Sequence, residues 1–335
     1  MLKLALVGCG LIARAHWHAI QEYATKIKVT ATIDSDFNRA KEFAKLTGAQ
    51  PFRSLDEALA KGDFDAVDLM LPHDVHEGAC MTCFQAGKAV LLEKPISNTL
   101  AGAERILATA KESASTLMVA EQAQYWMDVV KARELIDQGY VGEVLTARAY
   151  FFDRLVVDPA DPIPWRYSIE RSGGGISIDG GAHWIRPMRM LLGEIDSVFA
   201  ATASLIENME GESLAHAVFK FQSGVLASFQ ALKSDAVIAP IEDFRITGTQ
   251  GELVMERGRE GRLLGYTQDH PDGQELMSTM QGRIGSFGSE LTEFSNLVLH
   301  GKSPVAGPEV ALGELRTALA MYRSAKSGTW EKVWD

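Results

Sequence analysis

The sequence predicts a protein of the α/β class, with a doubly wound parallel sheet over residues 1–121 and an α+β part over residues 122–335. Three observations support this prediction. In the first part, apolar runs alternate with helical stretches. A glycine-containing loop directly follows the first apolar run. In the second part, strand-like runs follow one another through turn residues, which predicts a mainly antiparallel, open-faced sheet.

The first part contains apolar runs that we interpret as strands buried on both faces of a parallel sheet. These predicted strands are Leu2–Val7, Lys28–Ile33, Ala66–Leu71, Ala89–Leu92 and Leu117–Val119. The helices predicted between them are a stretch that follows Gly8–Ala13 and runs to about Tyr23, then Asn38–Thr47, Leu55–Lys61, His76–Ala86 and Ala101–Ser113. Repeated strand–helix units of this length are typical of a doubly wound sheet.

The second part has a different order of elements. Its predicted strands are Glu143–Phe152, Val198–Ile206, Ala215–Gln222, Val225–Lys233, Glu242–Gly248 and Leu253–Glu256. Its predicted helices are Val129–Gln138, Ser289–Leu299 and Val310–Ser327, of which the last can pack back on the first part. The stretches Asp158–Pro164 and Ser172–Gly181 are interpreted as active-site loops.

Composition excludes several classes of function. Lys and Arg total 33 against 44 Asp and Glu, a net charge of −11 that argues against binding to nucleic acid or to a membrane surface. No apolar run approaches the ~20 residues that span a bilayer, and no export signal is evident. Three cysteines cannot form a disulfide framework, which favours the cytoplasm. We therefore expect a cytoplasmic enzyme or binding protein.

The motif Gly8-x-Gly10-x-x-Ala13 follows the first strand and opens a helix, which is typical of a dinucleotide-binding Rossmann domain. The first glycine permits a tight turn, and the second lets the backbone approach a pyrophosphate. Leu11 and Ile12 open the helix, whose unpaired N–H groups would face the phosphates. The pattern predicts a nicotinamide dinucleotide as the cofactor.

Asp34 ends the second predicted strand, at the position where a carboxylate binds the ribose 2′-hydroxyl of NAD. Because a carboxylate repels a 2′-phosphate, this residue favours NAD over NADP. Ser35 and Arg39 lie close by in the sequence and could accommodate that phosphate, so NADP remains open. A loop aspartate that only meets solvent is the alternative interpretation.

Two further segments carry residues suited to proton transfer. Glu93-Lys94-Pro95 leaves the carboxyl end of a strand, the edge where parallel sheets bind ligands, and Lys94 would point toward the nicotinamide. Asp179 and His183 share one face if their segment is helical. An imidazole suits proton removal from a hydroxyl, and a lysine ammonium stabilises the developing alkoxide. A surface lysine and a packed core histidine are the alternatives.

Several of these segments form a pattern found in one family. They include the glycine motif, Pro72 with His76, Gly87-Lys88-Ala89-Val90, Glu93-Lys94-Pro95, Trp165-Arg166, Ser172-Gly173-Gly174-Gly175, Asp179-x-Gly181-x-His183, the segment from Phe244 to Gly251, and Ala320-Met321-Tyr322-x-Ser324-Ala325. Over essentially the whole chain this pattern resembles the glucose–fructose oxidoreductase / inositol dehydrogenase / MocA (Gfo/Idh/MocA) family. The lysine and histidine motifs are its most specific part.

The resemblance implies an NAD(P)-dependent oxidoreductase that transfers a hydride between the nicotinamide and a secondary alcohol or ketone of a sugar, polyol or sugar derivative. It implies that Lys94 and His183 form the acid/base pair and that Asp179 holds the substrate or a catalytic partner. It also implies a cis Lys94–Pro95 bond and a homodimer or homotetramer. The expected cofactor contacts are Gly8, Gly10, Leu11, Ile12, Asp34, Ser35, Arg39, Pro72, His76, Glu93, Lys94 and Pro95.

The chain departs from the family pattern in its substrate pocket. Many relatives carry an aspartate where Arg186 stands, and Asn and Arg where this chain has Gln122-Ala123-Gln124-Tyr125. We expect a pocket lined by Gln122, Tyr125, Trp165, Arg166, Trp184 and Arg186. Arg186 could bind an anionic substrate or form an internal salt bridge, and buried aromatic residues are often plain packing.

Some alternatives stay open. His73, His76, Cys80 and Cys83 have spacings that suggest zinc, but structural zinc sites draw ligands from two separate turns, so core packing is favoured and no metal is expected. An NADP-dependent reductase, a non-catalytic NAD(P)-sensing regulator and an NAD-dependent glycosidase are the competing functions. A small-molecule substrate, with neither nucleic acid nor membrane as partner, is expected in each case.

Overall fold

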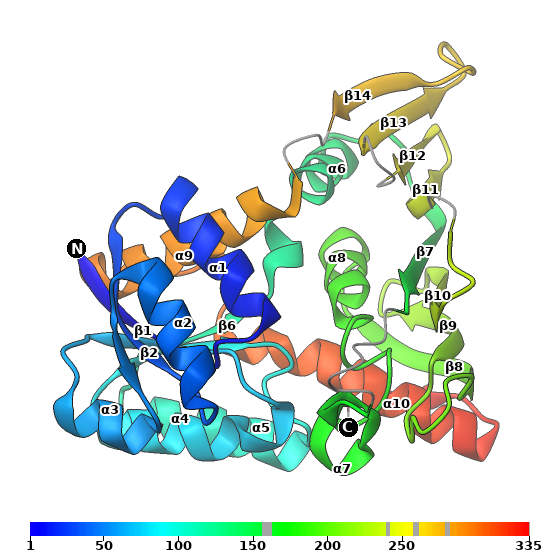
Figure 1. Ribbon diagram of the computed structural model, residues 1–335. Helices are drawn as coiled ribbons and strands as arrows, with labels where there is room; N and C mark the ends of the chain where they lie inside the picture. Colours follow the sequence, from blue (N-terminus) through cyan, green and yellow to red (C-terminus); the bar gives the residue numbers. More distant parts are fainter. Residues whose placement is uncertain (156–162, 239–241, 257–260, 279–281, 335) are drawn as a thin grey trace. The chain divides into compact units, whose positions relative to one another are not determined.

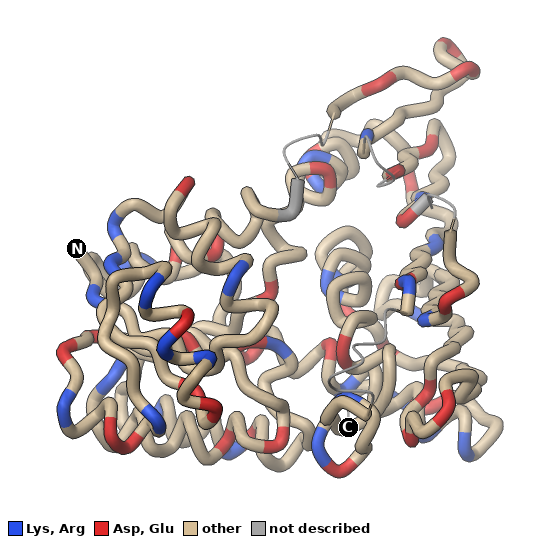
Figure 2. Tube along the Cα trace, in the orientation of Figure 1, with Lys and Arg blue, Asp and Glu red and all other residues tan. Residues whose placement is uncertain are grey.

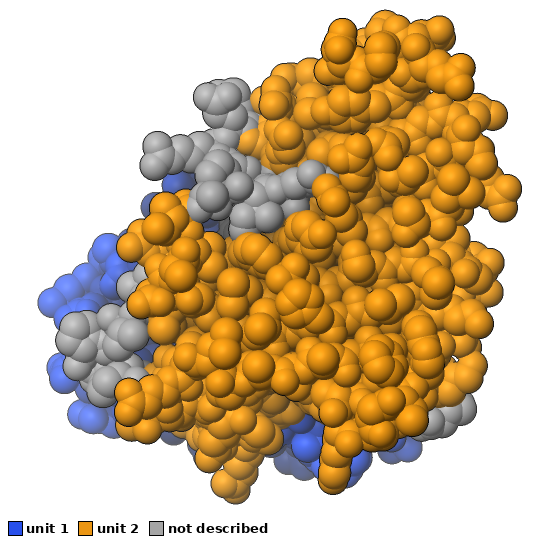
Figure 3. Space-filling view, turned by 90° about the vertical axis from the view of Figure 1, so that its right-hand side faces the viewer, with its two compact units in different colours: residues 1–122, 283–312 blue, residues 123–282, 313–335 orange. Residues whose placement is uncertain are grey.

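The computed structural model describes residues 1–155, 163–238, 242–256, 261–278 and 282–334. Residue contacts divide the chain into two units (Figure 3). Unit 1 comprises Met1–Gln122 and Arg283–Leu312, and unit 2 comprises Ala123–Gly282 and Gly313–Asp335. The expected division had one boundary, after residue 121, whereas the contacts return residues 283–312 to the N-terminal unit.

The described part of unit 1 contains a six-stranded parallel sheet with the order β3-β2-β1-β4-β5-β6. Its strands are β1 (Leu2–Val7), β2 (Ile27–Ile33), β3 (Gln50–Phe52), β4 (Ala66–Leu69), β5 (Ala89–Glu93) and β6 (Leu117–Ala120). The sequence order reverses between β1 and β4, where doubly wound sheets bind ligands at the carboxyl ends of the strands. The predicted doubly wound sheet is confirmed.

Helices cover both faces of this sheet (Figure 1). One face carries α1 (Leu11–Glu22), α2 (Phe37–Thr47) and α9 (Gly282–His300), and the other carries α3 (Leu55–Lys61), α4 (His76–Gln85) and α5 (Leu100–Glu112). Asp36, Ser54 and Thr99 each accept a backbone N–H in the first turn of α2, α3 and α5. The N-cap of α1 is Gly10, which offers no such side chain, so the first turn keeps backbone donors for a ligand.

Among the described residues, the sheet of unit 2 has nine strands with the order β14-β13-β12-β11-β7-β10-β9-β8-β15. They are β7 (Val144–Arg154), β8 (Ile195–Ala203), β9 (Leu214–Phe221), β10 (Leu226–Ser234), β11 (Glu242–Gly248), β12 (Gly251–Glu256), β13 (Arg262–Thr267), β14 (Gln274–Ser278) and β15 (Glu331–Lys332). Neighbours pair antiparallel except β7 and β10, which are parallel. The mainly antiparallel sheet is thus confirmed.

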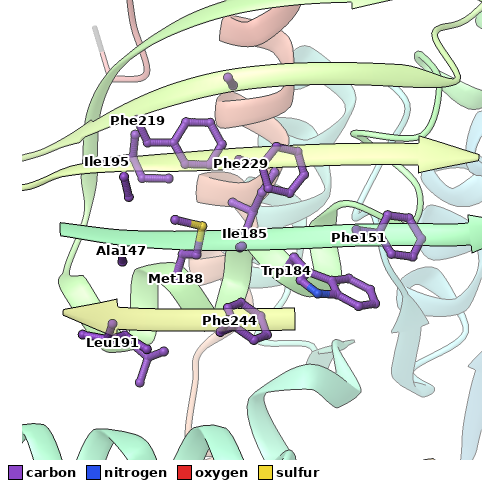
Figure 4. Close-up of a cluster of buried hydrophobic side chains, with 14 of the residues drawn as sticks. Ala147, Phe151, Trp184, Ile185, Met188, Leu191, Ile195, Phe219, Phe229 and Phe244 are labelled. Atoms are coloured by element: carbon purple, nitrogen blue, oxygen red, sulfur yellow. The ribbon is translucent and has the colours of Figure 1, made fainter. Parts of the chain in front are cut away.

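One face of this sheet packs against helices. These are α6 (Met127–Asp137), α8 (Ala182–Leu192) and α10 (Leu312–Ser327), and a core forms between them and the strands. Figure 4 shows Ile185 and Met188 of α8 among Phe219 and Phe229 of the sheet. Burial alternates strictly along β9, so every second side chain lies on the opposite, uncovered face.

Charge is mixed in both units. Figure 2 shows lysines and arginines interspersed with acidic residues along each trace. In the described ranges, no helix is long and apolar enough to cross a membrane.

Candidate active site

The glycine loop lies at the carboxyl edge of the unit 1 sheet and needs glycine for a steric reason. Gly8 has φ +93°, a left-handed conformation, and a Cβ there would come within 2.2 Å of the carbonyl oxygen of Met70. Gly8 donates its N–H to the carbonyl of Ile33 at 2.8 Å. The turn therefore brings the start of α1 beside the ends of β2 and β4. Leu11 at this start is 89% exposed, and Ile12 is half-buried.

Asp34 is held against this loop by its own hydrogen bonds. One carboxylate oxygen accepts the N–H of Cys9 and the other accepts the N–H of Asp36, both at 2.8 Å. The carboxylate is thereby positioned next to the glycine loop, as ribose binding requires. Ser35 and Arg39 are exposed, and the Arg39 guanidinium lies 3.6 Å from Asp36.

Lys94 follows the last residue of β5 at the same edge of the sheet. Its backbone N–H faces the carbonyl of Ala120 in β6 at 3.3 Å and the Glu93 carboxylate at 3.1 Å. The Lys94–Pro95 bond is cis, as the family resemblance implied. Lys94 is half-buried and Pro95 is buried.

The side chain of His76 is fully buried, with Nδ1 3.0 Å from the carbonyl oxygen of Pro95 and Nε2 2.9 Å from that of Leu71. Burial lowers the pKa of His76, so the ring is neutral near pH 7 and its single N–H donates to one of these two carbonyls. Pro72, next to Leu71, is half-buried at the same edge.

The Glu93 carboxylate has a partner inside unit 1. Only 8% of the residue is exposed, and its carboxylate lies 3.1 Å from the buried imidazole of His16 in α1. The sequence signals neither His16 nor this contact, because nothing local marks which residue of α1 faces the end of β5.

The residues of the histidine–cysteine pattern near α4 are part of the core. Cys80 and Cys83 are fully buried, and burial raises the pKa of Cys83 to about 12, which disfavours the thiolate that binds metals. In the parts of the chain that the structure describes, no group of three or more His, Cys, Asp or Glu is placed to hold a metal ion.

In unit 2, Asp179 lies just before α8 and His183 lies in its first turn. The two therefore do not share a helix face as predicted, because the helix begins only at Ala182. Asp179 instead accepts a hydrogen bond from Nε of Arg166 at 2.8 Å. The Arg166 guanidinium lies 4.4 Å from the ring centroid of Trp165. The structure thus brings Asp179, Arg166 and Trp165 together.

His183 is half-buried above an aromatic cluster. The ring centroid of Trp126 lies 6.4 Å from that of His183 and 5.4 Å from that of Trp184. Trp184 is 4% exposed, and its ring lies tilted against that of Phe151, with 4.2 Å between the ring centroids (Figure 4). Trp184 therefore packs in the core of unit 2.

The glycine-rich segment before Asp179 is held by hydrogen bonds to Glu212. No sequence pattern marked this residue. Its carboxylate accepts the N–H groups of Gly175 at 2.9 Å and Ser177 at 2.8 Å, and the hydroxyl of Tyr322 at 3.1 Å. A Cβ on Gly175 would lie 2.0 Å from the carbonyl oxygen of Glu212, so this close approach requires glycine. Burial raises the pKa of Glu212, and the hydrogen bonds from Ser177 and Tyr322 partly offset that effect.

Arg186 forms an internal salt bridge. It is 3% exposed, and its Nε and Nη2 donate to the two oxygens of Glu314 at 2.6 and 3.0 Å, while Nη1 donates to Gln124 at 2.9 Å. Of the two roles considered for Arg186, the structure therefore shows the internal salt bridge. Of the other expected pocket residues, Gln122 is buried at the end of unit 1 and Tyr125 is half-buried.

The residues of unit 1 fit a dinucleotide. The first turn of α1 has no side-chain cap, open space surrounds the missing side chain of Gly10, and Asp34 is held beside the loop. A doubly wound sheet with these features at its switch point defines the class of dinucleotide-binding Rossmann proteins.

Comparison with known proteins identifies the family. Residues 2–121 match the model of an oxidoreductase family with an NAD-binding Rossmann fold (Gfo/Idh/MocA), and residues 129–254 match the C-terminal domain of the same family. The chain therefore belongs to the Gfo/Idh/MocA family of NAD(P)-dependent oxidoreductases, as the resemblance predicted.

Relatives align along almost the full chain. A 1,5-anhydro-D-fructose reductase of Ensifer adhaerens is 25% identical, with 98% of this chain and 97% of the relative covered. A dTDP-3,4-didehydro-2,6-dideoxy-alpha-D-glucose 3-reductase of Actinomadura kijaniata is 29% identical, with 97% and 96% covered. A levoglucosan dehydrogenase solved with NADH has the same fold, with a TM-score of 0.88 at 21% identity and 99% of both chains covered.

Proposed function

We propose that this protein transfers a hydride between NAD(H) and a secondary alcohol or ketone of a sugar, polyol or sugar derivative. The observation that carries the proposal is the carboxyl edge of the unit 1 sheet, where Asp34 is held beside the glycine loop and Lys94 follows β5. The Ensifer and Actinomadura relatives, whose names describe reduction of sugar derivatives, support this substrate class.

Each of the chain's own residues would have a separate role in the reaction. Backbone N–H groups from Gly10 onward bind the pyrophosphate, and Asp34 accepts a hydrogen bond from the ribose hydroxyl. The nicotinamide, when bound, accepts or supplies the hydride. His183 takes the proton from the substrate hydroxyl, and Lys94 stabilises the negative charge that develops on its oxygen. Asp179 holds a further hydroxyl, with Arg166 fixing its carboxylate. In reduction, the proton moves the other way.

A substrate panel tests this function directly. Wild-type enzyme is mixed with NAD⁺ and myo-inositol, D-xylose, D-glucose, levoglucosan or D-gluconate, and NADH absorbance is followed. Turnover of at least one compound is the expected result. NAD binding without turnover of any panel member, in either direction, would favour the regulator. Cleavage of a chromogenic glycoside without net NADH would favour the glycosidase.

The preference for NAD follows from the position of Asp34. Replacing Asp34 by alanine removes a charged hydrogen-bond acceptor worth about 1.5–3 kcal/mol, so the dissociation constant of NAD⁺ should rise about tenfold or more. Discrimination against NADP⁺ should relax, since the repulsion of the 2′-phosphate is lost. Fluorescence titration with both cofactors measures the two effects. Asp63→Ala, an exposed carboxylate paired with Lys3 at 2.7 Å, is the matched control. An unchanged preference in Asp34→Ala would mean that other residues hold the ribose.

We also propose that the uncovered face of the unit 2 sheet joins copies of this chain in a homodimer or homotetramer. Large apolar side chains are exposed there, with Phe199 at 41%, Val218 at 37% and Leu226 at 48%. The ring centroids of Phe199 and Trp330 lie 6.0 Å apart. Contiguous apolar exposure of this kind marks association surfaces.

Phe199→Glu tests this assembly, because it places a charge on the apolar face, opposite Val218. Wild type should elute at two or four times the chain mass in light scattering coupled to size exclusion, and Phe199→Glu should shift toward a single chain. Ser223→Glu, in the exposed turn between β9 and β10, should keep the wild-type mass. A monomeric wild type would contradict the proposal.

A cytoplasmic location completes the proposal. It is supported by Cys9, Cys80 and Cys83, which are all free thiols in the structure, the state that a reducing compartment maintains.

A further inference from the structure

A buried cluster of ionisable residues lies within unit 1, directly behind Lys94. His16 of α1, Asp68 of β4 and Glu290 of α9 have no exposed surface, and Glu93 of β5 is 8% exposed. Burying three carboxyl groups around one imidazole costs free energy, because buried charges lose their hydration. Such a cluster therefore calls for a functional explanation. They are not placed to hold a metal in the described part of the chain.

The contacts in this cluster form a continuous path that ends at Lys94. The Asp68 carboxylate lies 2.7 Å from Nδ1 of His16. Nε2 of His16 lies 3.1 Å from Oε1 of Glu93, an ion-pair contact without hydrogen-bond geometry. The other oxygen of Glu93 accepts the backbone N–H of Lys94 at 3.1 Å. The two oxygens of Glu93 therefore connect the dinucleotide-binding helix α1 to the residue that carries the proposed catalytic amine.

The charge state of His16 suits this arrangement. Burial opposes a charged ring, but Asp68 and Glu93 together raise the pKa of His16 well above its usual value, so both ring nitrogens carry protons at neutral pH. Burial raises the pKa of Glu290 well above its usual value, and its carboxyl lies 4.0 Å from Nε2. The remaining neighbours are the carboxyl of Glu121, which acts on Glu290, and the ring of Phe287 at 5.2 Å.

We propose that His16 is a positioning residue for Lys94 that acts through the carboxylate of Glu93. His16 fixes the rotamer of Glu93, and Glu93 fixes the backbone at the point from which the Lys94 side chain leaves the sheet. On the other side of Lys94, the buried His76 faces the carbonyl of Pro95, so the segment is held at both ends. The proposal rests on the proposed catalytic role of Lys94.

A double-mutant cycle separates this role from a merely structural one. His16→Gln should lower kcat about tenfold or more on the best panel substrate, since a small displacement of a catalytic group can cost ~10²-fold. The dissociation constant of NAD⁺ should stay within about twofold, because Asp34 and the glycine loop are unchanged. In a Lys94→Ala background, His16→Gln should cause no further loss of kcat. His18→Gln, an exposed histidine of the same helix paired with Glu22, is the matched control.

The outcomes that would overturn the proposal are a wild-type kcat in His16→Gln, or independent, multiplying losses in the double variant. If His16→Gln does not fold, Glu93→Gln replaces it in the same cycle with the same expectation. If Lys94→Ala itself keeps full activity, Lys94 has no catalytic role and the proposed function loses this residue. That outcome is distinguishable from a failure of His16 to position the Lys94 backbone, which is measured separately.

Positioning can be measured without turnover. In protein labelled with [¹⁵N]lysine, the amide signal of Lys94 is the one absent from the Lys94→Ala spectrum. Because this amide donates to Glu93, its signal should shift in His16→Gln and stay in place in His18→Gln. An unmoved Lys94 signal in His16→Gln would show that the imidazole does not act on this segment.

Discussion

Replacing Lys94 by alanine is expected to lower kcat at least ~10²-fold and to leave the dissociation constant of NAD⁺ within about twofold. The alkoxide that forms when a hydroxyl loses its proton is far less stable than a hydroxyl, and a nearby ammonium lowers its energy. Alanine removes this charge entirely. Cofactor affinity should persist, because the residues proposed to bind the pyrophosphate and ribose lie on β1, α1 and the end of β2.

Two controls make this result specific. Lys111→Ala removes a lysine in the last turn of α5, in the same unit, and should keep wild-type kinetics. Lys94→Arg keeps a positive charge but changes its shape and hydrogen-bonding directions, so activity between alanine and wild type is expected. Near-normal kcat in Lys94→Ala would remove this residue from the mechanism. Stopped-flow measurement of NADH formation, with separate titration of NAD⁺, provides both constants.

The N-terminal sheet was predictable because its signals are local. A strand buried on both faces is a short apolar run, and Leu2–Val7 is observed with the bounds that the pattern predicts. The edge strand β3 (Gln50–Phe52) escaped prediction, since three residues show no period and one of them is proline. In unit 2, β13 and β14 are equally unmarked. A helix spanning Asp179 and His183 was only a conditional prediction, and α8 begins at Ala182.

The pairing of segments far apart in the chain could not be predicted from the sequence. The parallel pair of β7 and β10 and the return of α9 to unit 1 depend on contacts across much of the chain, which no local pattern encodes. Residues of the candidate site divide in the same way. Gly8 and Asp34 belong to a motif with fixed spacing, so their proximity was expected.

The missed residues are those whose role is set by a distant partner. Arg186 was open between a substrate contact and a salt bridge, and Glu314, 128 positions away, decides for the salt bridge. Glu212 reaches the glycine-rich segment, and His16 reaches Glu93, through tertiary packing alone. A buried charged residue must find a partner, but the sequence does not say which one.

The salt bridge of Arg186 also bears on the chemistry, because it anchors the helix that carries His183. Arg186 and Arg189 of α8 both donate to Glu314 of α10, and Arg189 also donates to Glu194 at 2.9 Å. Charge-assisted, bidentate contacts of this kind hold a helix in one rotation. The first turn of α8 is therefore fixed relative to the core of unit 2, and with it the ring of His183.

On this rigid helix, His183→Ala is expected to lower kcat at least ~10²-fold, because the substrate hydroxyl loses the group that accepts its proton. The His183 ring is half-buried beside Trp126, outside the packed core, so removing it should leave the helix in place and thermal unfolding nearly unchanged. Adding free imidazole should restore part of the activity of His183→Ala, since it can enter the space vacated and accept the proton. His300→Ala, an exposed histidine in the last turn of α9, should behave like wild type and show no response to imidazole. If His183→Ala turned over substrate at the wild-type rate, proton transfer would have to run through another group, and Asp179, held by Arg166 at 2.8 Å, would be the next residue to test.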